Sequence, residues 1–357
     1  MKRLEDLAKM LTYSPELEEQ RRWQNNLGSL LQKIKQTLKD RRFREKYLSN
    51  LSLMSILSRS IEIGKHRLRE RELAKTHYKI NPHYHSGYPF SHDAVRLRDP
   101  FISAVKHMRK YRVRVLYVTD HDNNLFFITL KNRPPESITK RFDIDSDNWM
   151  ITLSPKKGLL RMTKYHTLYI MNAREDHIVM KPGDKPLLNL EMIRPCNITR
   201  PERARILPVN EFLSQAYPFA TVNHPGLQGS FETEENVDRA FEIADVLGIP
   251  LFLEVFNGGV TPIQGYTNLW SEYYHEKHPE VPVFTGSDLH RPDLRPAGIW
   301  VRKELLKPAM ESRKGLEVNL AMARAVQSRT EDDVIQDKIY SESFKVLYGY
   351  VGKKLVG

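Results

Sequence analysis

The sequence predicts an α/β fold in which a mainly parallel sheet, closed or wound, follows a helical arm and precedes further helices. From residue 76 onward, short apolar runs rich in β-branched residues alternate with stretches of helical periodicity, as strands and crossover helices do. Before residue 76 the apolar periodicity is helical only. Hydrophobic residues make up 40% of the 357 residues, which is enough for one large domain with an appendage or for two domains.

Residues 1–75 are predicted to form a basic arm of two or three amphipathic helices. Leucine and isoleucine recur there at helical spacing, without a sustained heptad that would indicate a long coiled coil. The arm holds 18 Lys and Arg residues against 10 Asp and Glu, which leaves +8 of the whole chain's +12. This surplus favours nucleic acid as a partner of the arm, and a solvated helical surface is the alternative.

The remaining residues, 76–357, are predicted to form the main domain. In its first half we expect strands at 76–85, 113–119, 167–171 and 177–180, and a helix at 100–111. Residues 123–165 are polar, and we interpret them as an irregular insertion, while 182–208 is predicted to be a proline-punctuated loop. In the second half we expect strands at 219–223, 251–256, 281–285 and 299–301. The helices expected there begin at Thr233, surround Trp270 and cover 304–350.

Four of these predicted strands end in histidine or aspartate. His83 and His85 are two residues apart, so their side chains point to the same face of a strand. Residues of the same kind follow three later strands, at His121, at His224, and at Asp288 with His290. Because ligands gather where the carboxyl ends of parallel strands meet, we expect these side chains to form one site.

The ligand types indicate the chemistry of that site. Imidazoles and carboxylates without a thiolate suit Zn²⁺, Mn²⁺ or Fe²⁺, and six ligands exceed the need of one tetrahedral ion. Two or more ions close together can clamp a phosphoryl group. Cys196 is the only cysteine, which excludes an intramolecular disulfide and a cysteine-based zinc finger. We expect no membrane span and a cytoplasmic location, since no run of 18 apolar residues and no apolar signal segment occurs.

The four motifs resemble, in order, those of the PHP (polymerase and histidinol phosphatase) family of metal-dependent phosphoesterases. The resemblance covers about residues 76–300 and rests on these stretches: His83-Tyr84-His85-Ser86 with Ser91-His92-Asp93, Thr119-Asp120-His121-Asp122, His224-Pro225-Gly226 followed by Glu254–Asn257, and Gly286-Ser287-Asp288-Leu289-His290. It implies a distorted (β/α)7-type barrel with two or three divalent metal ions at the carboxyl ends of its strands.

The resemblance also implies which residues hold the ions. His83, His85 and Asp288 would bind one ion, His92, His121 and His290 a second, and His177 and His224 a third. The family usually has a bridging glutamate at the end of the preceding strand, but the matching stretch 168–172 contains no acid. The candidates to substitute for it from a neighbouring loop are Glu175 and Glu191, but we expect no bridge. We therefore expect two tightly held ions rather than three, because the third would have only His177 and His224.

The implied activity is hydrolysis of a phosphoester, either a small phosphomonoester or a nucleic-acid end. Asp288 would also accept a proton from the attacking water, and Arg291 would hold the phosphate. One alternative is a metal-dependent amidohydrolase, against which the pairing of Asp288 with His290 argues. Another is a non-catalytic PHP-like protein that binds nucleic acid through its arm. The sequence leaves the oligomeric state open.

Overall fold

The computed structural model describes residues 66–338 except 67, 92–93, 95, 157–165, 181–189, 198–205, 226–232, 260–265, 291, 293, 329 and 331. Nearly all of the predicted arm and the last part of the predicted helices at 304–350 lie outside the described residues. No helix in the part of the chain that the structure describes is long and apolar enough to cross a membrane.

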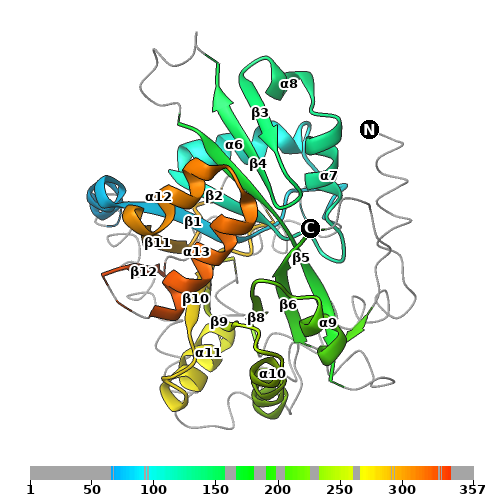
Figure 1. Cartoon of the computed structure of the whole chain (residues 1–357), viewed down its shortest axis with the longest axis vertical. Coiled ribbons are helices and arrows are strands. Elements are labelled where there is room, and N and C mark those ends of the chain that lie inside the picture. The colour runs from blue at the N-terminus through cyan, green and yellow to red at the C-terminus, as the bar shows by residue number, and fades with distance from the viewer. Residues whose placement is uncertain are drawn as a thin grey trace, which may run out of the picture.

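A curved sheet that nearly closes into a barrel forms the centre of the molecule, as Figure 1 shows. In spatial order its strands are β1 (His77–Tyr84), β2 (Val113–Val118), β5 (Leu168–Val179), β6 (Leu190–Pro195), β8 (Ala220–Asn223), β9 (Leu251–Asn257) and β10 (Val283–Gly286). The ring closes where the Asp288 N–H and the Ser287 hydroxyl donate to the His83 carbonyl, at 3.0 and 2.6 Å. The predicted distorted α/β barrel is therefore confirmed.

Two predictions about the middle of the chain were wrong. β5 is one strand of 12 residues, buried along its whole length, rather than two short strands. β6 lies within the predicted loop 182–208 and runs antiparallel to both neighbours, whereas the other barrel strands run parallel to one another. The short β7 (Leu207–Pro208) also lies in that stretch and pairs with β5.

The expected insertion is structured rather than irregular. It contains the helices α7 (Leu125–Asn132) and α8 (Glu136–Thr139) and the strands β3 (Phe142–Ser146) and β4 (Met150–Pro155). β3 and β4 pair antiparallel, and β4 also pairs antiparallel with β5. The apolar side chains of α7 join the core beside β2, which explains why this stretch folds.

The remaining helices pack on the outside of the barrel. They are α6 (Pro100–Lys110), α9 (Val209–Ser214), α10 (Thr233–Leu247), α11 (Tyr266–Lys277), α12 (Lys303–Ser312) and α13 (Gly315–Ser328). Asp99 caps α6 by accepting the Ile102 N–H at 3.0 Å. After α13 the chain forms β12 (Val334–Asp337), where a helix was expected, and β12 pairs with β11 (Gly298–Arg302), which extends the sheet beyond β1.

Candidate metal centre

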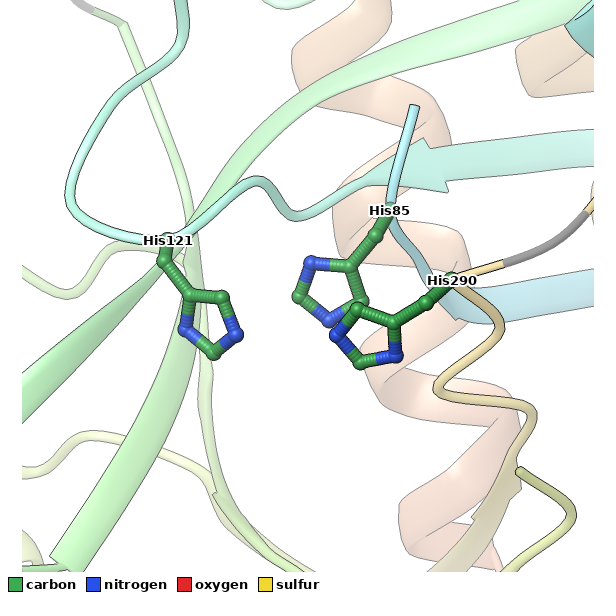
Figure 2. Close-up of side chains that lie close together, drawn as sticks. All are labelled: His85, His121 and His290. Atoms are coloured by element: carbon green, nitrogen blue, oxygen red, sulfur yellow. The ribbon is translucent and has the colours of Figure 1, made fainter. Parts of the chain in front are cut away.

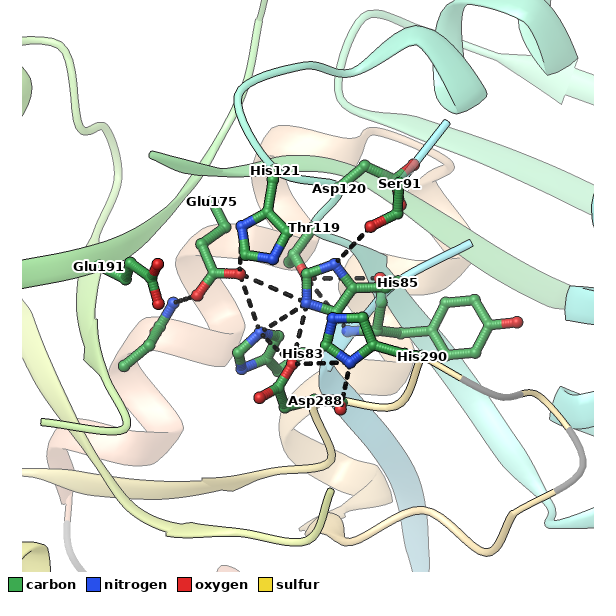
Figure 3. A network of polar contacts seen from close by, with 12 residues as sticks. His83, His85, Ser91, Thr119, Asp120, His121, Glu175, Glu191, Asp288 and His290 are labelled. Carbon is green, nitrogen blue, oxygen red and sulfur yellow. Dashed lines mark hydrogen bonds and ion pairs between the residues drawn. The ribbon is translucent and has the colours of Figure 1, made fainter. Parts of the chain in front are cut away.

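The structure brings the described candidate ligands together at the carboxyl ends of the barrel strands (Figure 3). His83 and Asp288 come from the two strands that close the ring, and the other described candidates surround them: His85, His121, His177, His224 and His290. The predicted ligand His92 and the predicted phosphate-binding Arg291 lie outside the described residues.

His83 and His85 enter the centre from the end of β1 through their Nε2 atoms, which lie 3.2 Å apart. On the opposite side of each ring, Nδ1 has a partner of its own. The Glu254 carboxylate lies 2.9 Å from Nδ1 of His83, and the Ser91 hydroxyl lies 3.3 Å from Nδ1 of His85. Such contacts fix the tautomer and the orientation of a ligating imidazole, so both Nε2 atoms are held towards the centre.

Gly286 makes the close approach of β9, β10 and β1 possible at this point. A Cβ atom on Gly286 would lie 1.9 Å from Oε1 of Glu254 and 2.9 Å from Cβ of His83. Any side chain there would push Glu254 away from the imidazole that it orients. The glycine of the Gly-Ser-Asp motif is thus required by packing beneath the centre.

Glu175 lies in the middle of the cluster. Its Oε2 is 3.3 Å from Nε2 of His83, Nε2 of His85 and Nδ1 of His121, and its Oε1 is 3.2 Å from Nε2 of His224. The expected absence of a bridging carboxylate is therefore corrected. The acid comes from the middle of β5 rather than from a loop, because that strand continues beyond the stretch where the acid was sought.

Glu191 gives the His177 and His224 pair a carboxylate as well. It projects from β6, directly opposite His177 in the antiparallel register. Its Oε1 lies 2.9 Å from Nε2 of His177, and its Oε2 lies 3.4 Å from Nε2 of His224. Asp122 lies 3.4 Å from the other ring nitrogen of His177. The expectation that this position would have only two histidines was wrong, since it has a third protein ligand within reach.

The first predicted set and the described members of the second set are also close together. Oδ1 of Asp288 lies 3.0 Å from Nε2 of His85 and 3.5 Å from Nε2 of His83, as the first predicted set requires. His121 and His290 both lie beside His85 (Figure 2), with ring centroids 4.5 and 4.2 Å from its own and 6.1 Å from each other. His85 therefore stands where the two sets meet.

The backbone is unusual at the same place. Among the described residues, five that are not glycine have positive φ, and three of them belong to the cluster: Asp122 (57°), His224 (24°) and Asp288 (43°). The left-handed region costs energy for residues with a Cβ atom, and such strain collects at functional sites. These conformations aim the three side chains at the carboxyl ends of the strands.

The buried carboxylates of the cluster need positive charge beside them to remain ionised. Burial alone would raise the pKa of Glu175, but the charges of His83 and His121 hold it well below its usual range. Burial alone would lower the pKa of His83, but Glu175, Glu254 and Asp288 raise it well above its usual range. The buried carboxylates are thus stabilised only when cations lie beside them, and metal ions can take the place of the imidazole protons.

The donor set fits divalent metal ions. Four overlapping groups have their ligand atoms within 4.8 Å of one another: His83 with His85 and Glu175, His83 with His224 and Asp288, His85 with His121 and His290, and His121 with His177 and Glu191. Ligand atoms of one tetrahedral zinc lie roughly 3.4 Å apart, since each is about 2.1 Å from the ion. Only small adjustments would bring each group to that spacing, and nitrogen and oxygen donors suit Zn²⁺, Mn²⁺ or Fe²⁺.

Sequence reasoning named Glu175 and Glu191 as substitutes but did not assign them as ligands. The available signal was the spacing of Glu175 and His177, which repeats the two-residue spacing of His83 and His85. Comparison with known proteins gave no match, whether with family models, curated proteins or solved structures. The resemblance to the PHP family therefore stays a prediction, and the function has to be argued from the cluster itself.

Proposed function

We propose that this chain is a metal-dependent phosphoesterase of the PHP type, with its reaction centre at the carboxyl ends of the barrel strands. The observation that carries the proposal is the position of Glu175, whose Oε2 lies 3.3 Å from imidazole nitrogens of His83, His85 and His121. Two neighbouring cations repel each other, and a carboxylate between them offsets that repulsion. The cluster therefore supports a centre with several metal ions.

We propose three divalent ions, each Zn²⁺, Mn²⁺ or Fe²⁺, with Glu175 between them. The protein ligands would be His83, His85 and Asp288 for the first, His121 and His290 together with His92 for the second, and His177, His224 and Glu191 for the third. When bound, such ions neutralise phosphate oxygens and lower the pKa of a water molecule towards neutrality.

Asp288 is the residue that we propose to accept the proton of the attacking water. Burial alone would raise its pKa, but the charges of His83 and His290 hold it well below its usual range, so its carboxylate is ionised at neutral pH. Asn257 donates to its Oδ2 at 2.9 Å and fixes its orientation.

The side chains of Asp288 and His290 are 11% and 29% exposed, whereas those of His83, His85 and Glu175 are fully buried. Substrate is therefore expected to approach from the side of Asp288 and His290.

The alternatives are less well supported. An amidohydrolase often needs a bridging modified lysine, but Glu175 lies at the bridging position, and the buried Lys79 of β1 is paired with Glu70 and Asp337. The non-catalytic alternative was motivated by a missing acid, and Glu175 removes that motive. The cytoplasmic location and the nucleic-acid partner of the arm belong to this proposal on the strength of the sequence alone.

Metal content and hydrolysis test the proposal together. The purified chain should contain transition metal by elemental analysis, and with Zn²⁺, Mn²⁺ or Fe²⁺ it should hydrolyse members of a panel of phosphomonoesters and oligonucleotides but not amides. Asp288→Asn should lower the rate by a factor on the order of 10²–10⁴, since it removes the proton acceptor. The matched control is Asp238→Asn on α10, whose carboxylate accepts from Tyr274 at 2.6 Å and lies 3.9 Å from Nε2 of His278.

Each outcome of this assay separates the candidate functions. Turnover of amides rather than phosphoesters would identify an amidohydrolase. Bound metal without turnover of any substrate would favour the non-catalytic alternative. Equal rates for Asp288→Asn and Asp238→Asn would remove Asp288 from the reaction.

A further inference from the structure

A group of cations lies at the other end of the barrel strands, where the chain enters them. Arg114 is the second residue of β2, and its guanidinium lies 5.6 and 5.7 Å from the ring centroids of Tyr78 and Tyr169. These tyrosines are the second residues of β1 and β5, the two strands beside β2. Arg114 is partly buried, and its Nε is enclosed without a hydrogen-bond partner among the residues that the structure describes.

Three more cationic groups surround Arg114. The Lys303 ammonium lies 5.5 Å from the centroid of the same Tyr78 ring, so two like charges share one aromatic ring. Partial burial and the positive charges of Arg114, Lys303 and Arg112 lower the pKa of His166, which places these three cations within electrostatic reach of His166. Arg112 and His166 are exposed to solvent. We call Arg112, Arg114, His166 and Lys303 the cation cluster.

This arrangement is unfavourable without an anion. Each cation–π contact with a tyrosine ring stabilises a guanidinium by about 0.5–2 kcal/mol. The neighbouring like charges and the partial burial both destabilise it. Lys303 cannot turn away, because it also donates to the carbonyls of Ala74 and Lys75 at 2.8 and 2.7 Å. Within the described part of the chain, no carboxylate forms an ion pair with Arg112, Arg114 or Lys303, and the charge of Glu304 offsets only part of the unfavourable surroundings that lower the pKa of Lys303. An anionic ligand would neutralise the cluster.

We propose that the cation cluster is a binding site for a phosphate group, separate from the metal centre. Arg114 would form charge-assisted hydrogen bonds with the phosphate oxygens. Six residues lie between Arg114 and His121, and the seven steps of extended chain that join the two correspond to about 23 Å. The phosphate belongs either to a small molecule or to the backbone of single-stranded nucleic acid. This proposal does not depend on the activity of the metal centre.

The test uses the full chain with two probes, inorganic pyrophosphate and a single-stranded oligonucleotide. Binding is measured by calorimetry, and the site is located by the rate at which phenylglyoxal modifies Arg114, followed by mass spectrometry of its peptide. We expect at least one probe to slow that modification, and Arg114→Gln to weaken its binding about tenfold or more. If the oligonucleotide is the ligand, the variant should also lower its salt dependence by about one unit of slope.

Two further variants keep the test decisive if Arg114→Gln folds poorly. Arg112→Asn removes an exposed charge at a position with φ of 61°, a conformation that asparagine tolerates. This variant should weaken binding of the same probe. Lys277→Gln is the control, because Lys277 lies 4.9 Å from the centroid of the Tyr273 ring but is neutralised by Glu234.

Binding of pyrophosphate alone identifies a small phosphate ligand, and binding of both probes identifies a phosphodiester backbone. Unchanged binding in both arginine variants, or no protection of Arg114 by either probe, would overturn the proposal.

Discussion

Two buried clusters of charged side chains lie along β1, and they differ in where their positive charge comes from. At the candidate metal centre, the described ion-pair partners of Glu175 are imidazoles, and Asn223 also donates to its Oε1 at 2.8 Å. In the ionic cluster near the start of the strand, the Lys79 ammonium lies 2.7 Å from both Glu70 and Asp337, and Arg295 pairs with Glu70 at 2.5 Å. The second cluster therefore carries its own permanent cations.

This difference shows why a set of ligand types is not sufficient evidence for a metal site. His66, Glu70 and Asp337 satisfy the same distance criterion as the groups at the metal centre. However, Lys79 occupies the space between the two carboxylates where a metal ion would have to lie. A buried ammonium and a metal ion exclude each other there, so we expect metal only at the centre around Glu175.

The largest expected effect comes from removing the permanent cation. Lys79→Met leaves Glu70 and Asp337 buried beside each other without their shared partner, and should reduce the free energy of unfolding by about 3–5 kcal/mol. Chemical denaturation measures this loss. Metal content should stay unchanged in the fraction that folds, and loss of metal from folded Lys79→Met would mean that the two clusters are not independent.

The next largest effect concerns the metal centre. Glu175→Gln keeps the shape of the side chain but removes the negative charge between the ions, so metal affinity should fall by about 100-fold or more, beyond the range typical of residues that only orient ligands. Titration with a competing chelator measures it. The metal-free variant should unfold at nearly the same denaturant concentration as the metal-free wild type. A variant that retains all its metal would show that Glu175 does not bridge.

The smallest expected effect is on pH dependence. As pH rises, the stability of the metal-free protein should fall, whereas its affinity for metal should increase. Burial alone would lower the pKa of His224, but Glu175, Glu191 and Asp288 raise it from 6.5 to about 9. In the metal-free protein, its ion pairs therefore stabilise the fold fully below pH 6.5 and are lost as pH rises to about 9. Metal binding needs the neutral imidazole, so metal affinity should rise over the same interval.

Thermal unfolding with and without chelator checks this prediction. The Tm of the chelated protein should fall as pH rises from 6.5 to 9, by roughly 2–4 °C for each kcal/mol lost. The ionic cluster affects stability in a different pH range. Lys79 and His66 outweigh the effect of burial and lower the pKa of Asp337 from 3.8 to about 2. Its contribution is present above pH 3.8 and disappears as pH falls through about 2. A flat Tm between pH 6.5 and 9 in chelator would contradict the assignment.

The sequence was sufficient to predict the barrel and the residues at the ends of β1, β2, β8 and β10. Those strands are short, and a histidine or aspartate follows the last residue of each within three positions, so the candidate site residues could be recognised from the pattern. His83, His121, His224 and Asp288 could be located for that reason. Their grouping around Glu175 could not, because it depends on how far each strand extends into the centre.

The middle of the chain was mispredicted because its strands bury charges on both faces. In β5, Glu175 and His177 face the metal centre, while Arg174 and Asp176 form an ion pair that also includes Arg194 of β6. A strand with four charged or titratable residues in a row has no alternation of apolar and polar side chains, and local reasoning assigns it to a loop. Only the pairing partners, which are distant in sequence, make its burial favourable.

The closure of the barrel has a consequence for the order of events during synthesis. The carbonyl of His83 accepts from Ser287 and Asp288, so the seam joins the first strand of the barrel to its last. A chain that leaves the ribosome from its amino end displays the histidines of β1 long before the residues that complete their surroundings exist. Contacts so distant in sequence also form late in folding, because closing a long loop costs entropy. The complete set of candidate ligands at this centre therefore assembles only after residue 288 has been translated.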